Sequence, residues 1–506
     1  MERRAIALSG GFISAGARIL SRGDFTPRAA ALSPLLAALL LLAGCATLEQ
    51  QGIAPESAAP AAAPKALGDT PEVAERKKLI ALYGGEYQWP KAQNYLNEVL
   101  VKLAKASDTP TQPYRVTILN SSVVNAFALP SGDLFVTRGL LALANDTSEV
   151  AAVMAHEIAH VTERHAFLRA EQEKTAAVIT QAAKVIQNRQ KGEEVEATAA
   201  RTIAGYSRQQ EFEADKIGIG VIARAGYDPF GAVRFLSALA RSSEMRAALI
   251  GQSATGKPDI LASHPSTPER IAAALQEARQ IGAPGLGDQA RRPYLTSIDG
   301  IIFGDDPSDG AIRGRKFIHP RLGFSFEAPE GYVLENSAQA VLGVANGGAE
   351  ALRFDSVRMP PGKTLKDYLT SGWIDGLLAS TIREGRVNGL PAVFADARAG
   401  DWNFRVAVIS FHDDVYRIIF ALRNLTPEAS KMFDDAVDSF QPISPEDAQL
   451  ARPLRLRLAT ALPGDNAASL AAKMALTDQP VEQFELLNGL DGDQVKPGEI
   501  YKIVAY

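Results

Sequence analysis

Residues 146–165 read Asp-Thr-Ser-Glu-Val-Ala-Ala-Val-Met-Ala-His-Glu-Ile-Ala-His-Val-Thr-Glu-Arg-His. Asp146 followed by Glu149 has the spacing of a capping box, which predicts that a helix begins at this point. Within the predicted helix, residues 156–160 form a His-Glu-Ile-Ala-His sequence, which is an HExxH motif.

The HExxH motif predicts a metal site on this helix. His156 and His160 are four residues apart and therefore lie one turn apart on one helix face, so both imidazoles can bind a single zinc ion. Glu157 is placed to accept a proton from the attacking water molecule rather than to bind the metal. The alternative is an amphipathic helix whose two histidines only pack against neighbours or face solvent.

Zinc needs a third protein ligand, and the sequence limits where it comes from. A metzincin would have glycine and histidine where this chain has Glu163 and Ala166, so that class is excluded. His165 misses the metzincin position by one residue, and we interpret it as a packing residue or as a support for a ligand.

A later acidic helix offers the missing ligand. In residues 206–218, Tyr-Ser-Arg-Gln-Gln-Glu-Phe-Glu-Ala-Asp-Lys-Ile-Gly, Glu211 and Asp215 share one helix face. Glu211 can therefore bind the metal while Asp215 holds a ligand histidine by a hydrogen bond. Glu213 points elsewhere and is expected to be solvated. A charged, solvent-facing helix is the alternative interpretation.

Three ordered motifs, HEIAHVTERH, SRQQEFEADKIG and SHPSTPERI, occur within residues 76–280. Together they resemble the HtpX-like and CAAX-prenyl-protease-related zinc metallopeptidases, the gluzincin family forty-eight. The resemblance implies a mainly α-helical catalytic domain with a small β-sheet. It also implies one Zn²⁺ per chain. The roles it implies are zinc ligands at His156, His160 and Glu211, a general base at Glu157 and an orienting carboxylate at Asp215.

The same resemblance extends to a substrate-binding strand and a loop histidine. Two apolar runs around Ser131-Gly132-Asp133 predict a hairpin. In this family the corresponding segment is an edge strand beside the zinc, although a plain core hairpin is the alternative. The residues expected to pair with substrate backbone are Asn125, Ala126, Phe127 and Ala128. The resemblance implies that His264 either stabilises the tetrahedral intermediate or fills the open metal position and keeps the enzyme latent.

The N-terminus predicts export and a lipid anchor. Arginines precede an apolar run, Ala29–Leu42, with the length of a signal-peptide core. Leu42–Cys45 resembles a bacterial lipobox, which implies lipidation of Cys45 and removal of the rest of residues 1–45. Ala46 at the next position implies sorting to the outer membrane, on its periplasmic side. An ordinary secretory signal with a chance cysteine is the alternative. Residues 46–75 are rich in alanine and proline, and we expect a flexible tether.

Composition excludes several other classes. The chain of 506 residues is 46% hydrophobic and 22% charged, with net charge −5, so no basic footprint for nucleic acid is present. A single cysteine excludes a disulfide framework. After residue 45, no apolar run approaches the roughly 20 residues that span a bilayer, which predicts a soluble mature chain.

The C-terminal half carries weaker signals. Residues 281–315 are expected to be a connector. Residues 316–445 mix short β-type runs with helical stretches, which predicts an α+β accessory domain resembling the Mog1/PsbP sandwich type. His319 and His412 lie there without partners and are expected to be structural. Residues 450–506 resemble a LysM module, a βααβ fold that binds N-acetylglucosamine polymers. The Leu-Arg-Leu-Arg run in its first strand departs from that pattern.

Taken together, the sequence predicts a zinc metalloendopeptidase that hydrolyses misfolded or stalled envelope proteins, its substrates. The membrane, through the anchor, and peptidoglycan are further expected partners. The alternative is a latent, chaperone-like assembly factor of the outer membrane, or a peptidoglycan-binding adaptor, whose zinc site is plugged by His264.

Overall fold

The computed structural model describes residues 70–506 apart from 187–188, 250–263, 265–266, 338–339 and 477, with side chains for all of these except 176–206. The predicted signal segment, Cys45 and most of the tether lie outside the described residues. The described residues belong to one compact unit. None of the helices described is long and apolar enough to cross a membrane.

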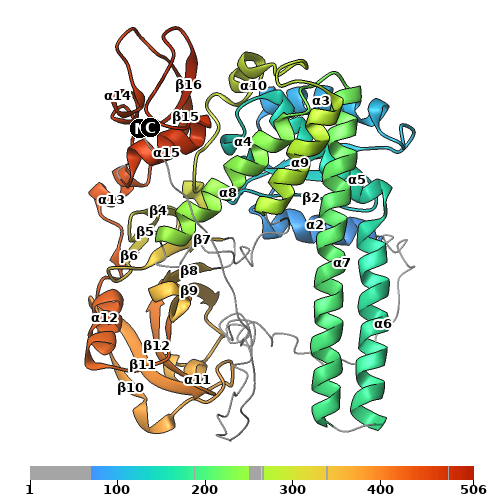
Figure 1. Ribbon diagram of the computed structural model, residues 1–506. Coiled ribbons are helices and arrows are strands. Elements are labelled where there is room, and N and C mark those ends of the chain that lie inside the picture. The colour runs from blue at the N-terminus through green and yellow to red at the C-terminus, as the bar shows by residue number, and fades with distance from the viewer. Residues whose placement is uncertain (1–69, 187–188, 250–263, 265–266, 338–339, 477) are drawn as a thin grey trace, which may run out of the picture. The chain divides into compact units, whose positions relative to one another are not determined.

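A small sheet and a group of helices make up the N-terminal part (Figure 1). The sheet has the strand order β1-β3-β2, with β3 parallel to β1 and antiparallel to β2, so β2 is an edge strand. The β2–β3 pair is the predicted hairpin. The strands are β1 (Arg115–Leu119), β2 (Ala126–Ala128) and β3 (Asp133–Thr137). The helices are α2 (Pro71–Leu82), α3 (Pro90–Ala106), α4 (Arg138–Leu143), α5 (Thr147–Thr162), α6 (His165–Ile186), α7 (Arg189–Arg224), α8 (Gly231–Leu249), α9 (Pro268–Ile281) and α10 (Arg291–Ile298).

Helix α5 is the centre of this part. It begins where the sequence predicts, because the Asp146 side chain accepts a hydrogen bond from the Glu149 backbone N–H. The Glu149 carboxylate accepts from the N–H of Asn145 rather than from the cap residue itself. Helix α5 is buried along most of its length, and α3, α7, α8 and β2 pack around it. Its fully buried residues, such as Met154, anchor it in the largest apolar cluster.

Glycines allow the neighbouring helices to approach α5 closely. A Cβ at Gly218 of α7 would lie 3.1 Å from the backbone nitrogen of His156. A Cβ at Gly231 of α8 would lie 2.5 Å from the Ser148 carbonyl. Both close approaches bring polar side chains of α7 and α8 to the two ends of α5.

The accessory region contains two antiparallel sheets with an aromatic core between them. The larger sheet has the order β10-β11-β12-β13-β9-β8-β7 and the smaller has the order β14-β6-β5-β4. The rings of Phe324, Phe354 and Phe440 contact one another in the shared core, with Phe324 stacked on Phe440 and the other two pairs tilted. The strands are β4 (Ala311–Arg313), β5 (Lys316–His319), β6 (Phe324–Glu327), β7 (Val333–Asn336), β8 (Val341–Ala345), β9 (Glu350–Arg358), β10 (Arg383–Val387), β11 (Leu390–Ala399), β12 (Trp402–Phe411), β13 (Asp414–Leu422) and β14 (Gln441–Pro442). The helices are α11 (Leu365–Leu369), α12 (Pro427–Asp438) and α13 (Pro445–Leu450), with short 3₁₀ turns at Pro307–Asp309, Asn346–Gly348 and Ala379–Thr381.

The C-terminal module has the order strand, helix, helix, strand. Its elements are β15 (Arg455–Thr460), α14 (Ala467–Ala471), α15 (Pro480–Asn488) and β16 (Ile500–Ala505), and β15 pairs antiparallel with β16. This order is the one expected for residues 450–506, and the likeness to a LysM fold stays a prediction. Leu456 of β15 is fully buried in the same apolar cluster as α5.

Candidate metal centre

Four side chains from three segments converge beside α5. His156 and His160 come from α5, Glu211 from α7, and His264 from the segment before α9. One ligand atom of each lies within 4.8 Å of the others. The Nε2 atoms of His156 and His160 are 3.0 Å apart, and the closest Glu211 oxygen is 3.4 Å from His156 Nε2. The structure therefore brings the three predicted zinc ligands together.

Hydrogen bonds on the far side of each imidazole orient the two histidines. His156 Nδ1 lies 2.9 Å from Asp215 Oδ1, so its N–H donates to that carboxylate and its Nε2 lone pair faces the cluster. His160 Nδ1 lies 2.8 Å from His165 Nδ1, and a hydrogen bond there leaves His160 Nε2 facing the cluster as well. Two imidazole nitrogens and one carboxylate form a donor set that fits zinc.

Arg270 of α9 links the acidic residues of the site. Its Nε and Nη2 atoms each donate to one oxygen of Asp215 at 2.8 Å, and its Nη1 lies 3.0 Å from Glu211 Oε2. The guanidinium is almost fully buried. Arg270 belongs to the SHPSTPERI motif, but no role for it was predicted from the sequence. A buried pair of carboxylates needs a nearby cation, which is the signal that could have identified it.

A contact between His165 and Glu213 extends the arrangement outward from the metal centre. His165 is buried against His160, consistent with the predicted supporting position. Its Nε2 lies 3.4 Å from Glu213 Oε2, and the Glu213 side chain is about half exposed. Glu213 is therefore partly solvated, as expected, but it faces His165 rather than solvent alone.

Electrostatics in the cluster favour a bound cation. Burial would raise the pKa of Glu211, but hydrogen bonds from His156 and His264 hold it well below its usual range. Burial would lower the pKa of His156, but its hydrogen bonds to Asp215 and Glu211 outweigh burial and raise it to about 10. Burial and the neighbouring histidines lower the pKa of His160. A proton and a metal cation therefore compete for the same donors.

Glu157 lies beside the four-residue cluster without being one of its members. Its carboxylate is buried, and Oε1 is 3.6 Å from His264 Nε2. This position is the one expected of a group that accepts a proton next to the metal. His264 Nδ1 lies 2.9 Å from Glu211 Oε2 and 3.2 Å from His156 Nε2, so His264 adds a third nitrogen, and a fourth donor group, to the set.

An apolar cavity of about 80 Å³ adjoins the cluster. His156, Glu157 and His264 form its polar side. Its other walls are mainly apolar and include Ala152 and Val153 of α5 with Phe235, Leu236 and Leu239 of α8. A cavity of this character accepts an apolar side chain next to the polar group.

The predicted substrate strand borders this cavity. Asn125 and Ala126 line it, which places the start of edge strand β2 beside His156 and Glu157. The Asn125 side chain donates to the Tyr83 hydroxyl at 2.9 Å. Phe127 stacks on Phe135 with 4.9 Å between ring centroids. Ala128, the last predicted residue, pairs with Leu134 of β3.

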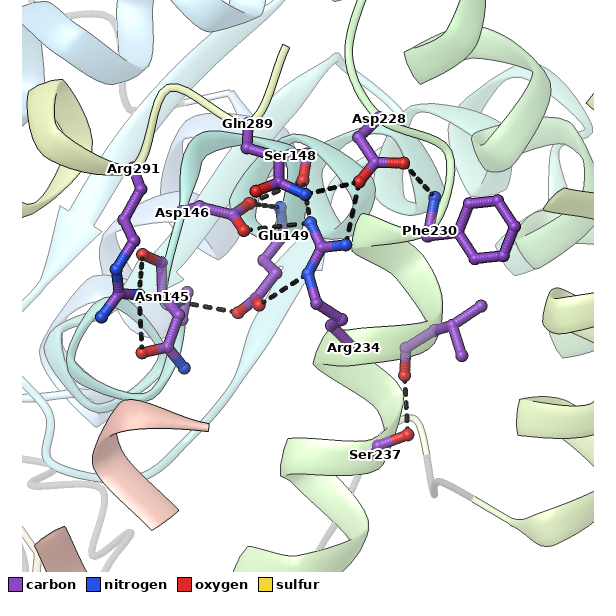
Figure 2. Close-up of polar contacts among 12 residues, drawn as sticks. Asn145, Asp146, Ser148, Glu149, Asp228, Phe230, Arg234, Ser237, Gln289 and Arg291 are labelled. Atoms are coloured by element: carbon purple, nitrogen blue, oxygen red, sulfur yellow. Dashed lines mark hydrogen bonds and ion pairs between the residues drawn. The ribbon is translucent and has the colours of Figure 1, made fainter. Parts of the chain in front are cut away.

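A buried charge network fixes the start of α5 (Figure 2). Arg234 of α8 donates to Asp146 at 3.0 Å, to Ser148 at 2.7 Å and to Asp228 at 2.9 Å. Its Nε lies 3.4 Å from Glu149 Oε1. One guanidinium thus contacts three carboxylates and ties α8 to the N-terminus of the helix that carries the HExxH motif.

Comparison with known proteins defines the class of this site. Residues 90–278 match Peptidase family M48, so this segment is an M48 peptidase domain. The predicted family resemblance is therefore confirmed.

Individual relatives cover parts of the chain. The chain is 32% identical over 247 residues to the "Putative beta-barrel assembly-enhancing protease" of Vibrio cholerae, covering 46% of this chain and 49% of that protein. It is 29% identical over 202 residues to the "Beta-barrel assembly-enhancing protease" of Escherichia coli K12, covering 38% and 40%. It is 28% identical over 193 residues to a "Protease HtpX homolog" of Desulforapulum autotrophicum, covering 37% and 57%. The chain spans less than two thirds of the length of each of these relatives.

Proposed function

We propose that the chain is a zinc-dependent metalloendopeptidase. The observation that carries the proposal is the convergence of His156, His160 and Glu211 beside Glu157. Zinc, when held by these three ligands, supplies a Lewis acid that polarises a peptide carbonyl and lowers the pKa of water.

The chain's own residues supply the proton transfers and the positioning. Glu157 accepts the proton of the attacking water molecule and returns it to the leaving amine. Asp215 holds His156 with its Nε2 toward the metal, and Arg270 holds Asp215 and Glu211. The apolar walls around the cavity exclude competing water and favour a substrate residue with an apolar side chain.

The proposed substrates are misfolded or stalled envelope proteins. The names of the Vibrio and Escherichia relatives connect those proteins to β-barrel assembly. An unfolded outer-membrane protein offers extended, apolar segments that fit an edge strand beside an apolar cavity. The proposed location is the periplasm, with a lipid on Cys45 holding the chain to the outer membrane and residues 46–75 as the tether. Peptidoglycan binding by the C-terminal module belongs to the same proposal.

The contacts of His264 favour a second candidate, a latent enzyme. His264 Nδ1 lies within hydrogen-bonding distance of both Glu211 and His156, where a substrate carbonyl or water molecule would approach. In this state the chain acts as an assembly factor or adaptor, and cleavage requires His264 to move away.

Zinc content and casein cleavage by purified residues 46–506 test both candidates. For a constitutive peptidase, we expect the wild type to cleave casein and Glu157→Gln to keep zinc but lose cleavage. For a latent peptidase, we expect a silent wild type and cleavage by His264→Ala. Retained cleavage by zinc-loaded Glu157→Gln, or silence in both the wild type and His264→Ala with zinc bound, would contradict peptidase activity at this site.

A further inference from the structure

Lys502 of strand β16 is a buried charge outside the metal centre. Its side chain is fully buried in the structure. Its Nζ donates to the backbone carbonyls of Ala142 at 2.7 Å, Leu143 at 3.1 Å and Ala144 at 2.7 Å. An ammonium group has three N–H donors, and here all three are satisfied by consecutive carbonyls.

These carbonyls lie at the C-terminal end of helix α4. The last carbonyls of a helix have no partner within the helix and carry its partial negative charge. A lysine from the C-terminal module supplies both the hydrogen bonds and the positive charge that this end requires. Burial removes the Lys502 amine from water and lowers its pKa well below the usual value, whereas the three surrounding carbonyl oxygens, which can only accept, favour the protonated form.

The segment capped by Lys502 leads directly into α5. Asn145 follows Ala144, and Asp146 is the cap residue of α5. Arg291 donates to the Asn145 carbonyl at 2.9 Å and to the Ile500 carbonyl of β16 at 3.3 Å, and Figure 2 shows its contact with Asn145. The C-terminal module therefore reaches the α4–α5 turn, residues 142–145, both directly and through Arg291.

Further contacts hold the module against the peptidase region, by which we mean β1–β3, α2–α10 and the segment directly after α10 that shares the apolar cluster around α5. The backbone N–H of Gly300 donates to the Leu456 carbonyl at 2.8 Å, and the Leu456 N–H donates to Ile301 at 2.9 Å. Leu456 is buried in the apolar cluster around α5, and Leu486 and Ile500 pack against the same cluster. A module attached only by a tether would show none of these contacts.

Both helices joined by the turn that Lys502 contacts, α4 before it and α5 after it, reach the metal centre. Leu140 of α4 lines the same cavity as His156 and Glu157. Helix α5, which starts just after the turn, carries three of the side chains described above, His156, Glu157 and His160. A shift of the α4–α5 turn would therefore move one wall of the cavity and the start of the ligand-bearing helix together.

We propose that the C-terminal module is an intramolecular clamp for the metal centre and that Lys502 is its positioning residue. The clamp acts on the α4–α5 turn and through it sets the position of α5. The effect on cleavage rests on the proposed peptidase function, but the effect on metal binding does not. In this proposal the C-terminal module acts on the metal centre of its own chain, and this action does not depend on any ligand that the module binds.

The test compares Lys502→Met with Lys496→Met in the full chain, because Lys496 is an exposed lysine of the same module. The readouts are zinc affinity by chelator competition, and hydrogen–deuterium exchange of residues 142–152. We expect Lys502→Met to bind zinc about tenfold or more weakly and to exchange faster across this segment, by analogy with the loss of a supporting contact to a metal ligand. Strands β11–β13 should exchange as in the wild type, and Lys496→Met should match the wild type throughout.

Two further variants keep the test decisive. Lys502→Gln retains an amide donor, so we expect partial recovery of zinc affinity. If Lys502→Met does not fold, Arg291→Met, which removes the indirect link at a half-exposed position, is expected to give the same changes to a smaller extent. Folded variants of Lys502 and Arg291 that bind zinc like the wild type and show unchanged exchange in residues 142–152 would overturn the proposal, with or without measurable peptidase activity.

Discussion

Arg270 is the residue on which the acidic side of the metal centre depends. One planar guanidinium contacts both oxygens of Asp215 and one oxygen of Glu211. Asp215 in turn fixes the ring of His156. The positions of two ligands, His156 through Asp215 and Glu211 directly, therefore depend on this one arginine. A lysine at this position could not make the same paired contacts.

Arg270→Lys tests this dependence. We expect zinc affinity to fall about 10- to 100-fold, because the substitution releases the carboxylate that orients a ligand histidine. Chelator competition measures the affinity, and Arg279→Lys on the exposed face of the same helix is the matched control. Zinc affinity within twofold of the wild type for Arg270→Lys would show that Asp215 is held by other contacts.

His319 provides a pH-dependent stability prediction. Burial lowers the pKa of His319 to about 4 in the folded chain, against a usual value near 6.5. Below pH 6.5 the unfolded chain takes up this proton more readily than the folded one, so the group destabilises the fold as pH falls from about 6.5 to about 4.

The expected outcome is that His319→Gln reduces the acid sensitivity of the accessory region. The unfolding temperature of the accessory region should rise in His319→Gln relative to the wild type as pH falls from 6.5 to 4. Above pH 7 the difference between the two proteins should stay constant. Thermal unfolding monitored over this pH range measures the difference, and the exposed His412, replaced by asparagine, is the control. A difference independent of pH would show that burial does not lower the pKa of His319.

Local spacing, together with the family resemblance, was enough to predict the metal ligands and the orienting carboxylate Asp215, but not the arginine that holds that carboxylate. His156 and His160 share a helix face by periodicity, and the i,i+4 spacing of Glu211 and Asp215 predicts their common face. Arg270 was given no role, because its partners lie 55 and 59 residues earlier, on another helix. Such distances depend on how helices pack, which sequence periodicity does not encode.

At the scale of elements, β2 is a short strand that pairs only with β3 among the strands that the structure describes. Hydrogen bonds from Thr137 to the Asn125 carbonyl and from Leu129 to the Asp133 carbonyl direct alternate residues of this strand toward β3. The backbone groups of Ala126 and Ala128 therefore face away from β3. A substrate segment added at this edge would bond to those two residues.

N-methylated peptide substrates test the role of this strand. We expect N-methylation of amides that pair with Ala126 or Ala128 to lower kcat/KM by about fivefold, because each removes one backbone hydrogen bond worth about 1 kcal/mol. N-methylation of the intervening amides should have little effect, so sensitivity should alternate along the peptide. A uniform loss at every position would indicate that the methyl groups clash without strand pairing.

The sequence predicted some elements well and others only in outline. The capping box located the start of α5, and two apolar runs located the β2–β3 hairpin, since both depend on neighbouring residues. The parallel pairing of β1 with β3 and the order of the seven-stranded sheet were not predicted. The β1–β3 pair and, in the larger sheet, the β13–β9 pair join strands that are not consecutive in the chain, and their register is set by burial of shared faces.

At the scale of the whole molecule, apolar clusters divide the chain differently from its order in sequence. The aromatic core of the accessory region is separate from the cluster around α5. The C-terminal module follows the accessory region in sequence, yet Leu456 belongs to the cluster around α5. Segments that share a core are expected to unfold together.

Removal of zinc should therefore affect only part of the molecule. The proposed ligands link α5 to α7, so metal binding stabilises the peptidase region and the C-terminal module that shares its core. At a free zinc concentration 1,000 times Kd, this stabilisation is about 4 kcal/mol. Calorimetry of the full chain, with zinc or with a chelator, should show one transition that moves down by several degrees on chelation and a second, from the accessory sheets, that does not move. In His160→Ala, which lacks one ligand, the first transition should no longer respond to zinc. Equal shifts of both transitions would mean that the accessory region unfolds with the peptidase region, and the absence of any shift would argue against a bound metal.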